Sequence, residues 1–139
     1  MTGKPVTNIN VTYNVALVTV DNLPNKVKLI SDILNAIAEQ GINIDMINQS
    51  PPYRGTINLS FTLPSDKLVK AISTLNKFKK SIRNLHIEVD ANSTKIAVYG
   101  ESMRDIPGVA AKIFTLFANN NVDIKLVTTL LFAKRVKII

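Results

Sequence analysis

The sequence contains no cysteine and no tryptophan, and it has a single histidine, His86. Without cysteine the chain has no disulfide, no thiolate nucleophile and no thiolate ligand for zinc. A single histidine also excludes a metal site that is built from several imidazoles. From these absences we expect no metal site and no cofactor.

Long hydrophobic runs are missing as well. No apolar stretch approaches the ~20 residues that a membrane-spanning helix needs, and residues 1–10 lack the apolar segment of a secretion signal. Hydrophobic residues make up 46% of the 139 residues and charged residues only 19%, which favours a folded core over disorder. We therefore expect a cytoplasmic protein without a membrane partner, large enough for one domain or two very small ones.

The charge is moderately basic, with 17 Lys and Arg against 10 Asp and Glu and a net charge of +7. This permits nucleic-acid binding, but RNA-recognition domains stack bases on several aromatic residues of their central strands. Here aromatic residues make up only 6%, and the third expected strand offers only Phe61. The densest basic groups fall where a helix end and a solvated strand face are expected, so we expect no nucleic-acid partner. These groups are Lys77, Lys79, Lys80 and Arg83, then Lys134, Arg135 and Lys137.

The hydrophobic periodicity of residues 15–90 predicts the order β-α-β-β-α-β, which is the ferredoxin-like arrangement of the α+β class. Gly41 is expected to end the first helix, and Ser65 to cap the start of the second. A further strand at 6–10 precedes this module, joined by a short link at 12–14. The expected elements are strands at 15–20, 42–46, 57–63 and 86–90, with helices at 29–38 and 65–78.

The same pattern begins again after a polar link at 91–94. Adding 80 to the residue number places Val18 on Val98, Ile33 on Ile113 and Ile44 on Ile124, which indicates an internal repeat. The second copy, at 95–139, stops after its third strand and is therefore incomplete at its C-terminus. Because an open sheet edge is unfavourable, we expect the strand at 6–10 to complete it, so that the module at 15–90 is inserted into the second one.

Three segments resemble the tandem ACT modules at the C-terminus of aspartate kinase. Residues 41–49 (GINIDMINQ) resemble the family's G-I-N-I-D-M-I-x-Q, and residues 100–111 (GESMRDIPGVAA) resemble G-x-x-M-R-x-x-P-G-V-A-A. Residues 61–64 (FTLP) are similar to F-T-V-P. The resemblance extends over residues 6–139. It implies two ACT modules with four-stranded antiparallel sheets backed by helices, and a homodimer formed through the modules.

The resemblance also implies a function. In the family, such modules bind lysine, threonine or both at module interfaces and regulate a kinase domain that phosphorylates aspartate with ATP. This sequence contains no glycine-rich opening of such a kinase domain and no catalytic residues in a motif context. It therefore resembles the regulatory part alone, which would act on a separate kinase domain or chain. A free-standing ACT sensor and a ligand-free dimerisation scaffold for another enzyme are the alternatives.

An amino-acid effector needs a site for its carboxylate and acceptors for its ammonium. The helix start at 105–108 suits the carboxylate, with Pro107 at the first helical position, although these residues also fit an ordinary helix start. Asn43, Asp45 and Gln49 share one strand face and offer acceptors, as an ordinary polar strand face also would. By the resemblance, a first-module loop faces second-module residues across the interface. The candidate effector-binding residues are Asn25, Lys28, Leu29, Ile30, Asn43, Asp45, Gln49, Asp105, Pro107, Gly108, Ala110, Asp123 and Ile124.

The first-module loop departs from the family pattern V-P-D-K-P-G. Asn25 replaces the aspartate that would face an ammonium, Val27 replaces the proline, and Lys28 replaces a glycine whose missing side chain lets a ligand approach the backbone. In the second module, Asp123 and Lys125 stand for an asparagine and a glutamate. We therefore expect effector binding at the first loop to be weakened, altered or lost.

Overall fold

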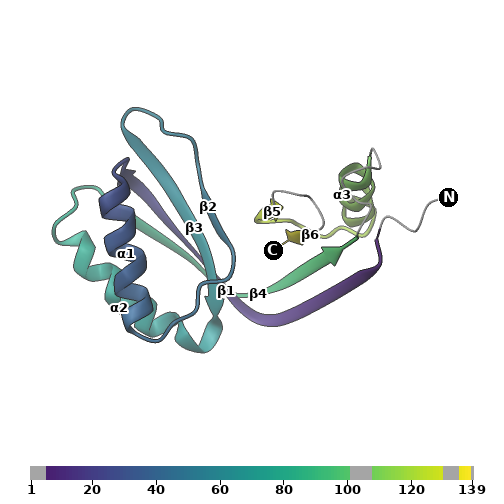
Figure 1. Cartoon of the computed structure of the whole chain (residues 1–139), viewed down its shortest axis with the longest axis horizontal. Coiled ribbons are helices and arrows are strands. Elements are labelled where there is room, and N and C mark those ends of the chain that lie inside the picture. Colours follow the sequence, from purple (N-terminus) through teal and green to yellow (C-terminus); the bar gives the residue numbers. More distant parts are fainter. Residues whose placement is uncertain (1–5, 101–107, 130–134, 139) are drawn as a thin grey trace. The chain divides into compact units, whose positions relative to one another are not determined.

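The computed structural model describes residues 6–100, 108–129 and 135–138, with side chains described up to Val127. Within these residues, no helix is both long and apolar enough to cross a membrane. Figure 1 shows the order of the elements along the chain. They are β1 (Asn8–Pro24), α1 (Val27–Glu39), β2 (Ile47–Gln49), β3 (Thr56–Pro64), the 3-10 helix η1 (Ser65–Lys67), α2 (Leu68–Lys79), β4 (His86–Tyr99), α3 (Val109–Asn119), β5 (Val127–Thr129) and β6 (Arg135–Ile138).

The chain divides into two compact units. Tyr13–Ser93 forms one, here called the central unit, and Met1–Thr12 with Thr94–Ile139 forms the other, here called the split unit. Within the split unit, the backbone N–H of Thr7 donates to the carbonyl of Tyr99 at 2.8 Å. We keep the module limits 15–90 and 95–139 as a proposal, with residues 6–10 belonging to the second module, and this contact supports it.

The central unit is a sheet in the order β2-β3-β1-β4 with two helices, α1 and α2. β3 is antiparallel to both β1 and β2. The core lies between the sheet and the helices, where Phe61 of β3, Ile33 of α1 and Leu75 of α2 are completely buried. The predicted α+β class and ferredoxin-like order are confirmed.

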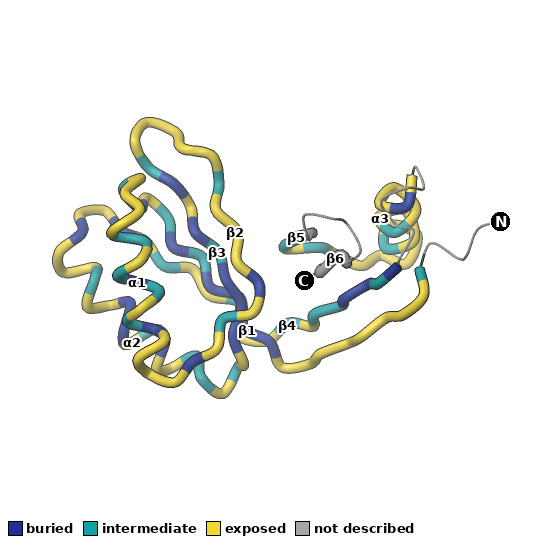
Figure 2. The backbone as a smooth tube through the Cα atoms, in the orientation of Figure 1, coloured by how far each residue is buried: buried dark blue, intermediate teal, exposed yellow. Residues whose placement is uncertain are grey.

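The split unit has a smaller described core. β6 is antiparallel to both β4 and β5, and α3 is its helix. Val98 and Val109 are the buried residues of the described cluster, with half-buried Ile113, Phe117 and Ile124 packed against them. Figure 2 shows that α3 is exposed over most of its length.

The internal repeat reappears in the backbone. β5 begins and ends 80 residues after β2, and α3 ends at Asn119, 80 residues after Glu39 at the end of α1. Gly41 follows α1 with φ 73°, as predicted for a helix end, and Asn121 takes its place after α3 with φ 56°. Asparagine tolerates this left-handed backbone better than most residues with a side chain, so the second copy retains the same helix ending without glycine.

The strand limits differ from those expected in two ways. The links at 12–14 and 91–94 are not breaks, because β1 and β4 run continuously through them. Asn14 adopts φ 57° within β1, a conformation that asparagine accepts, and polar side chains do not prevent backbone pairing. The expected strand at 42–46 is not a regular strand, and the short strand β2 follows it instead; residues 122–126 and β5 show the same arrangement in the second copy. The last strand is Arg135–Ile138, and Ile139 lies outside the described residues.

The predicted role of Ser65 is also wrong. Residues 65–67 form η1, and α2 begins at Leu68 with Lys67 at the N-cap position. The Ser65 hydroxyl donates to the carbonyl of Ala91 at 2.8 Å, a bond between distant parts of the chain. A local sequence pattern does not reveal such a competing partner.

Thr62 explains why the segment before β2 pairs irregularly with β3. Its buried hydroxyl accepts the Met46 N–H at 2.9 Å, in place of a backbone carbonyl. We expect Thr62→Val to lower the free energy of unfolding by about 1–3 kcal/mol, because the buried N–H loses its acceptor. Urea unfolding measures this. Thr56→Val, which removes an exposed hydroxyl that donates to the Tyr53 carbonyl, is the control, and equal losses would contradict this role of Thr62.

Candidate effector site

The loop that enters α1 and the first turn of this helix together carry four of the candidate effector residues. The loop backbone is held by the Asn25 N–H, which donates to the Gly55 carbonyl at 3.0 Å. α1 then begins at Val27, with Lys26 at the N-cap position, no side-chain cap and no acidic residue in the first turn. The positive end of the helix dipole therefore has no acidic side chain in its own first turn, which favours an anionic group there. Asn25 is exposed, whereas Leu29 and Ile30 are half-buried against the core.

Lys28 lies on the surface of α1, where it pairs with a carboxylate of the same helix. Its Nζ is 3.1 Å from Oδ1 and 3.4 Å from Oδ2 of Asp32, one turn further along the helix. The Lys28 side chain is 87% exposed, so this pair is easily broken by salt or by a competing ligand.

An open pocket of about 580 Å³ lies beside the start of α1. Three cationic side chains line it, with one carboxylate, Asp32, that already pairs with Lys28. Such a lining suits a carboxylate better than an ammonium. The sequence did not indicate that the segment after α2, residues 81–83, lines this pocket. These residues lie beside the start of α1 only because the chain folds that way. The lining residues are Pro24, Lys26, Lys28, Leu29, Asp32, Ser81, Ile82 and Arg83.

The proposed acceptors Asn43, Asp45 and Gln49 are all exposed. Ile42 and Met46 are buried, so the alternation that predicted the exposed positions of Asn43 and Asp45 holds although the segment is not a regular strand. The Asp45 N–H donates to the Thr62 carbonyl at 3.1 Å, and this bond holds the Asp45 backbone beside β3. These side chains are accessible to an amine ligand.

The second-module candidates are only partly described. α3 begins at Val109, with Gly108 as N-cap at φ 81°, so the expectation that Pro107 is the first helical residue is wrong. A left-handed backbone at this cap favours glycine, which explains why the helix starts after Gly108. Pro107 and Asp105 lie outside the described residues.

The remaining second-module candidates are Ala110, Asp123 and Ile124. Ala110 and Asp123 are exposed, and Ile124 packs half-buried against the small core of the split unit. Ile124 therefore has a structural role there, whereas the other two are accessible.

Comparison with known proteins identifies the family. The ACT domain family matches residues 17–79, and a second ACT domain family matches residues 96–130. An aspartokinase of Bacillus sp. (strain MGA3) is 38% identical over 112 residues, which is 81% of this chain. In the crystal structure of aspartokinase alpha and beta subunits, one chain is 32% identical, with a TM-score of 0.82, over 96% of this chain and 86% of that one. This chain belongs to the tandem ACT-domain regulatory regions of aspartokinases.

Other aspartokinase regulatory regions agree in fold. The regulatory subunit of aspartate kinase from Thermus thermophilus superposes with a TM-score of 0.85 over 97% of this chain and 87% of that one, at 24% identity. This chain spans only 27% of the length of the Bacillus aspartokinase that it matches. The match thus concerns the regulatory ACT region of that relative.

Proposed function

We propose that this chain is the regulatory part of an aspartate kinase in the cytoplasm. It binds lysine, threonine or both at an interface of ACT modules, forms a homodimer, and controls a separate kinase domain or chain that phosphorylates aspartate. The observation that carries the proposal is the match of nearly the whole chain, at 32% identity, to one chain of an aspartokinase with alpha and beta subunits.

The proposed mechanism is a population shift. An effector that binds one arrangement of the modules more tightly than another increases the population of that arrangement. The kinase part responds because its own contacts differ between the two arrangements, and the coupling is reciprocal. The positive end of the α1 dipole suits the carboxylate of a free amino acid, and the exposed acceptors Asn43 and Asp45 suit its ammonium.

Exposed apolar residues on α3 support the homodimer. Phe114 is 44% exposed and Leu116 is 63% exposed, which is high for large apolar side chains. A dimer contact that covers α3 would remove these side chains from water. Light scattering of the purified chain measures the mass directly, and a monomer at micromolar concentration would contradict this part of the proposal.

Titration calorimetry with lysine and threonine, separately and together, tests the sensing role. We expect saturable heat from at least one of them, with one or two ligands bound per dimer. Because Asn25 and Lys28 depart from the family pattern, we expect dissociation constants above the low micromolar range. A folded dimer that gives no heat at millimolar ligand would indicate a scaffold or a sensor of another ligand. Co-purification with a kinase chain then separates a subunit from a free-standing protein.

A further inference from the structure

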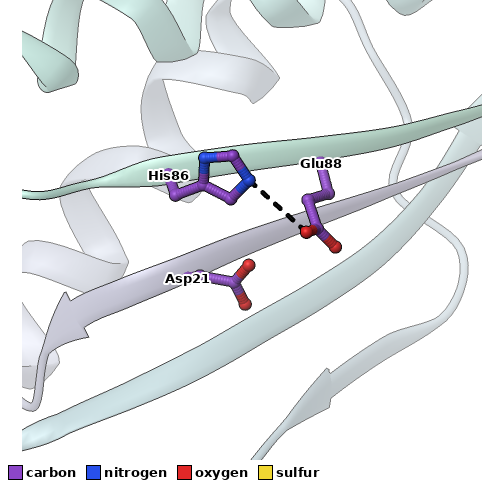
Figure 3. Close-up of side chains that lie close together, drawn as sticks. All are labelled: Asp21, His86 and Glu88. Carbon is purple, nitrogen blue, oxygen red and sulfur yellow. Dashed lines mark ion pairs between the residues drawn. The ribbon is translucent and has the colours of Figure 1, made fainter.

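Three potential metal ligands lie close together in the central unit, apart from the candidate effector residues. They are Asp21 of β1 and His86 and Glu88 of β4, two neighbouring strands. Figure 3 shows the three side chains converging from these strands. One ligand atom from each residue lies within 4.8 Å of the others, and His86 Nε2 is 3.4 Å from Glu88 Oε1.

The three side chains share the face of the sheet that the helices leave uncovered. Ile87, between His86 and Glu88, packs against the helix-side core, and so does Val20, which precedes Asp21. Because side chains alternate along a strand, the three ligands point to the opposite face. Asp21 is half-buried, and the side chains of His86 and Glu88 are 57% and 65% exposed, so an ion can reach them from water.

We propose that Asp21, His86 and Glu88 bind a divalent transition-metal ion of the zinc class. A tetrahedral ion with ligands at ~2.1 Å keeps its ligand atoms about 3.4 Å apart, and the His86–Glu88 pair already has this spacing. The Asp21 carboxylate comes from β1, the strand beside β4, and its ligand atom lies within 4.8 Å of the other two. One imidazole nitrogen with two carboxylates suits zinc, cobalt or nickel better than calcium or magnesium, which prefer oxygen alone.

Charge and orientation favour the same occupant. Asp21 and Glu88 place two carboxylates close together, and a divalent cation bound between them offsets their mutual repulsion. The Asn58 side-chain amide has one orientation in which its oxygen and its nitrogen both find hydrogen-bond partners. In that orientation the nitrogen donates to Asp21 Oδ1 at 3.2 Å. Such an outer contact orients a carboxylate ligand and leaves its second oxygen for the metal. Water completes the coordination, because the face is open.

Zinc titration of the full chain tests the proposal by calorimetry and by nuclear magnetic resonance. His86 is the only histidine, so its imidazole resonances report this site alone. We expect one zinc ion per chain, a shift of the imidazole resonances, and a higher melting temperature when zinc is in excess. We expect His86→Ala, Asp21→Asn and Glu88→Gln each to weaken zinc binding by at least about tenfold.

Glu39→Gln is the matched control, because it removes one exposed carboxylate at the end of α1 and leaves the cluster intact. Its zinc affinity is expected to equal that of the unchanged chain. Circular dichroism verifies that each variant is folded, and Asp21→Asn and Glu88→Gln preserve side-chain shape. Equal zinc affinity of the unchanged chain and His86→Ala, zinc binding without an imidazole shift, or no saturable binding at millimolar zinc would each overturn the proposal. None of these results depends on amino-acid binding.

Discussion

Phe61→Ala is expected to lower the free energy of unfolding of the central unit by about 3–5 kcal/mol. Among the residues whose side chains the structure describes, Phe61 is the largest that is completely buried, and it lies in the core between the sheet and the helices. Its truncation removes apolar contacts from both sides of this core and leaves a cavity that the rigid sheet fills poorly. Because the free energy of unfolding of an ordinary domain is about 5–15 kcal/mol, this change removes a large part of it.

Chemical unfolding followed by circular dichroism measures this loss. Val69→Ala is the control, since Val69 lies on α2 with 82% of its surface exposed. We expect its effect to stay within about 0.5 kcal/mol. A loss below about 1 kcal/mol for Phe61→Ala would show that this core repacks freely, contrary to the close packing expected for a buried aromatic residue.

The double variant Asn25→Asp with Lys28→Gly is expected to tighten effector binding by about 10–100-fold. It supplies an anionic partner for the effector's ammonium and removes a cation from the positive end of α1. A hydrogen bond to a charged group is worth about 1.5–3 kcal/mol, which corresponds to this range of affinity. The backbone at the helix start also becomes accessible, because glycine has no side chain there.

Calorimetry with lysine and threonine compares the double variant with the unchanged chain. Lys70→Gln with Asn76→Asp on α2 makes the same change in net charge at exposed positions of another helix. This control is expected to leave the affinity within about twofold, because exposed charges more than ~10 Å from a ligand are screened at ordinary ionic strength. Unchanged affinity in the double variant would place the effector away from the first-module loop.

The candidate effector site could be predicted from the sequence only in part. Period-2 alternation correctly predicted that Asn43 and Asp45 are exposed, because burial on one face of an extended segment is a local property. The first residue of α3 is Val109, two residues after the predicted Pro107, since a left-handed cap and a proline both mark helix starts. The pocket beside Lys28 was not foreseen, because Arg83 reaches it only through the packing of α1 and α2.

The sequence by itself determined the order of the elements, the repeat at an offset of 80 and the family. Each depends on local periodicity or on short motifs, and these can be recognised without knowing where the segment lies in the fold. Only the tertiary structure decided that β1 and β4 continue through polar links and that Ser65 bonds to Ala91 instead of capping a helix. It also brought Asp21 of β1 beside His86 of β4, residues 65 positions apart in the sequence. The pairing of distant strands sets these neighbours, and a pattern that repeats every two or four residues carries no information about which strands pair.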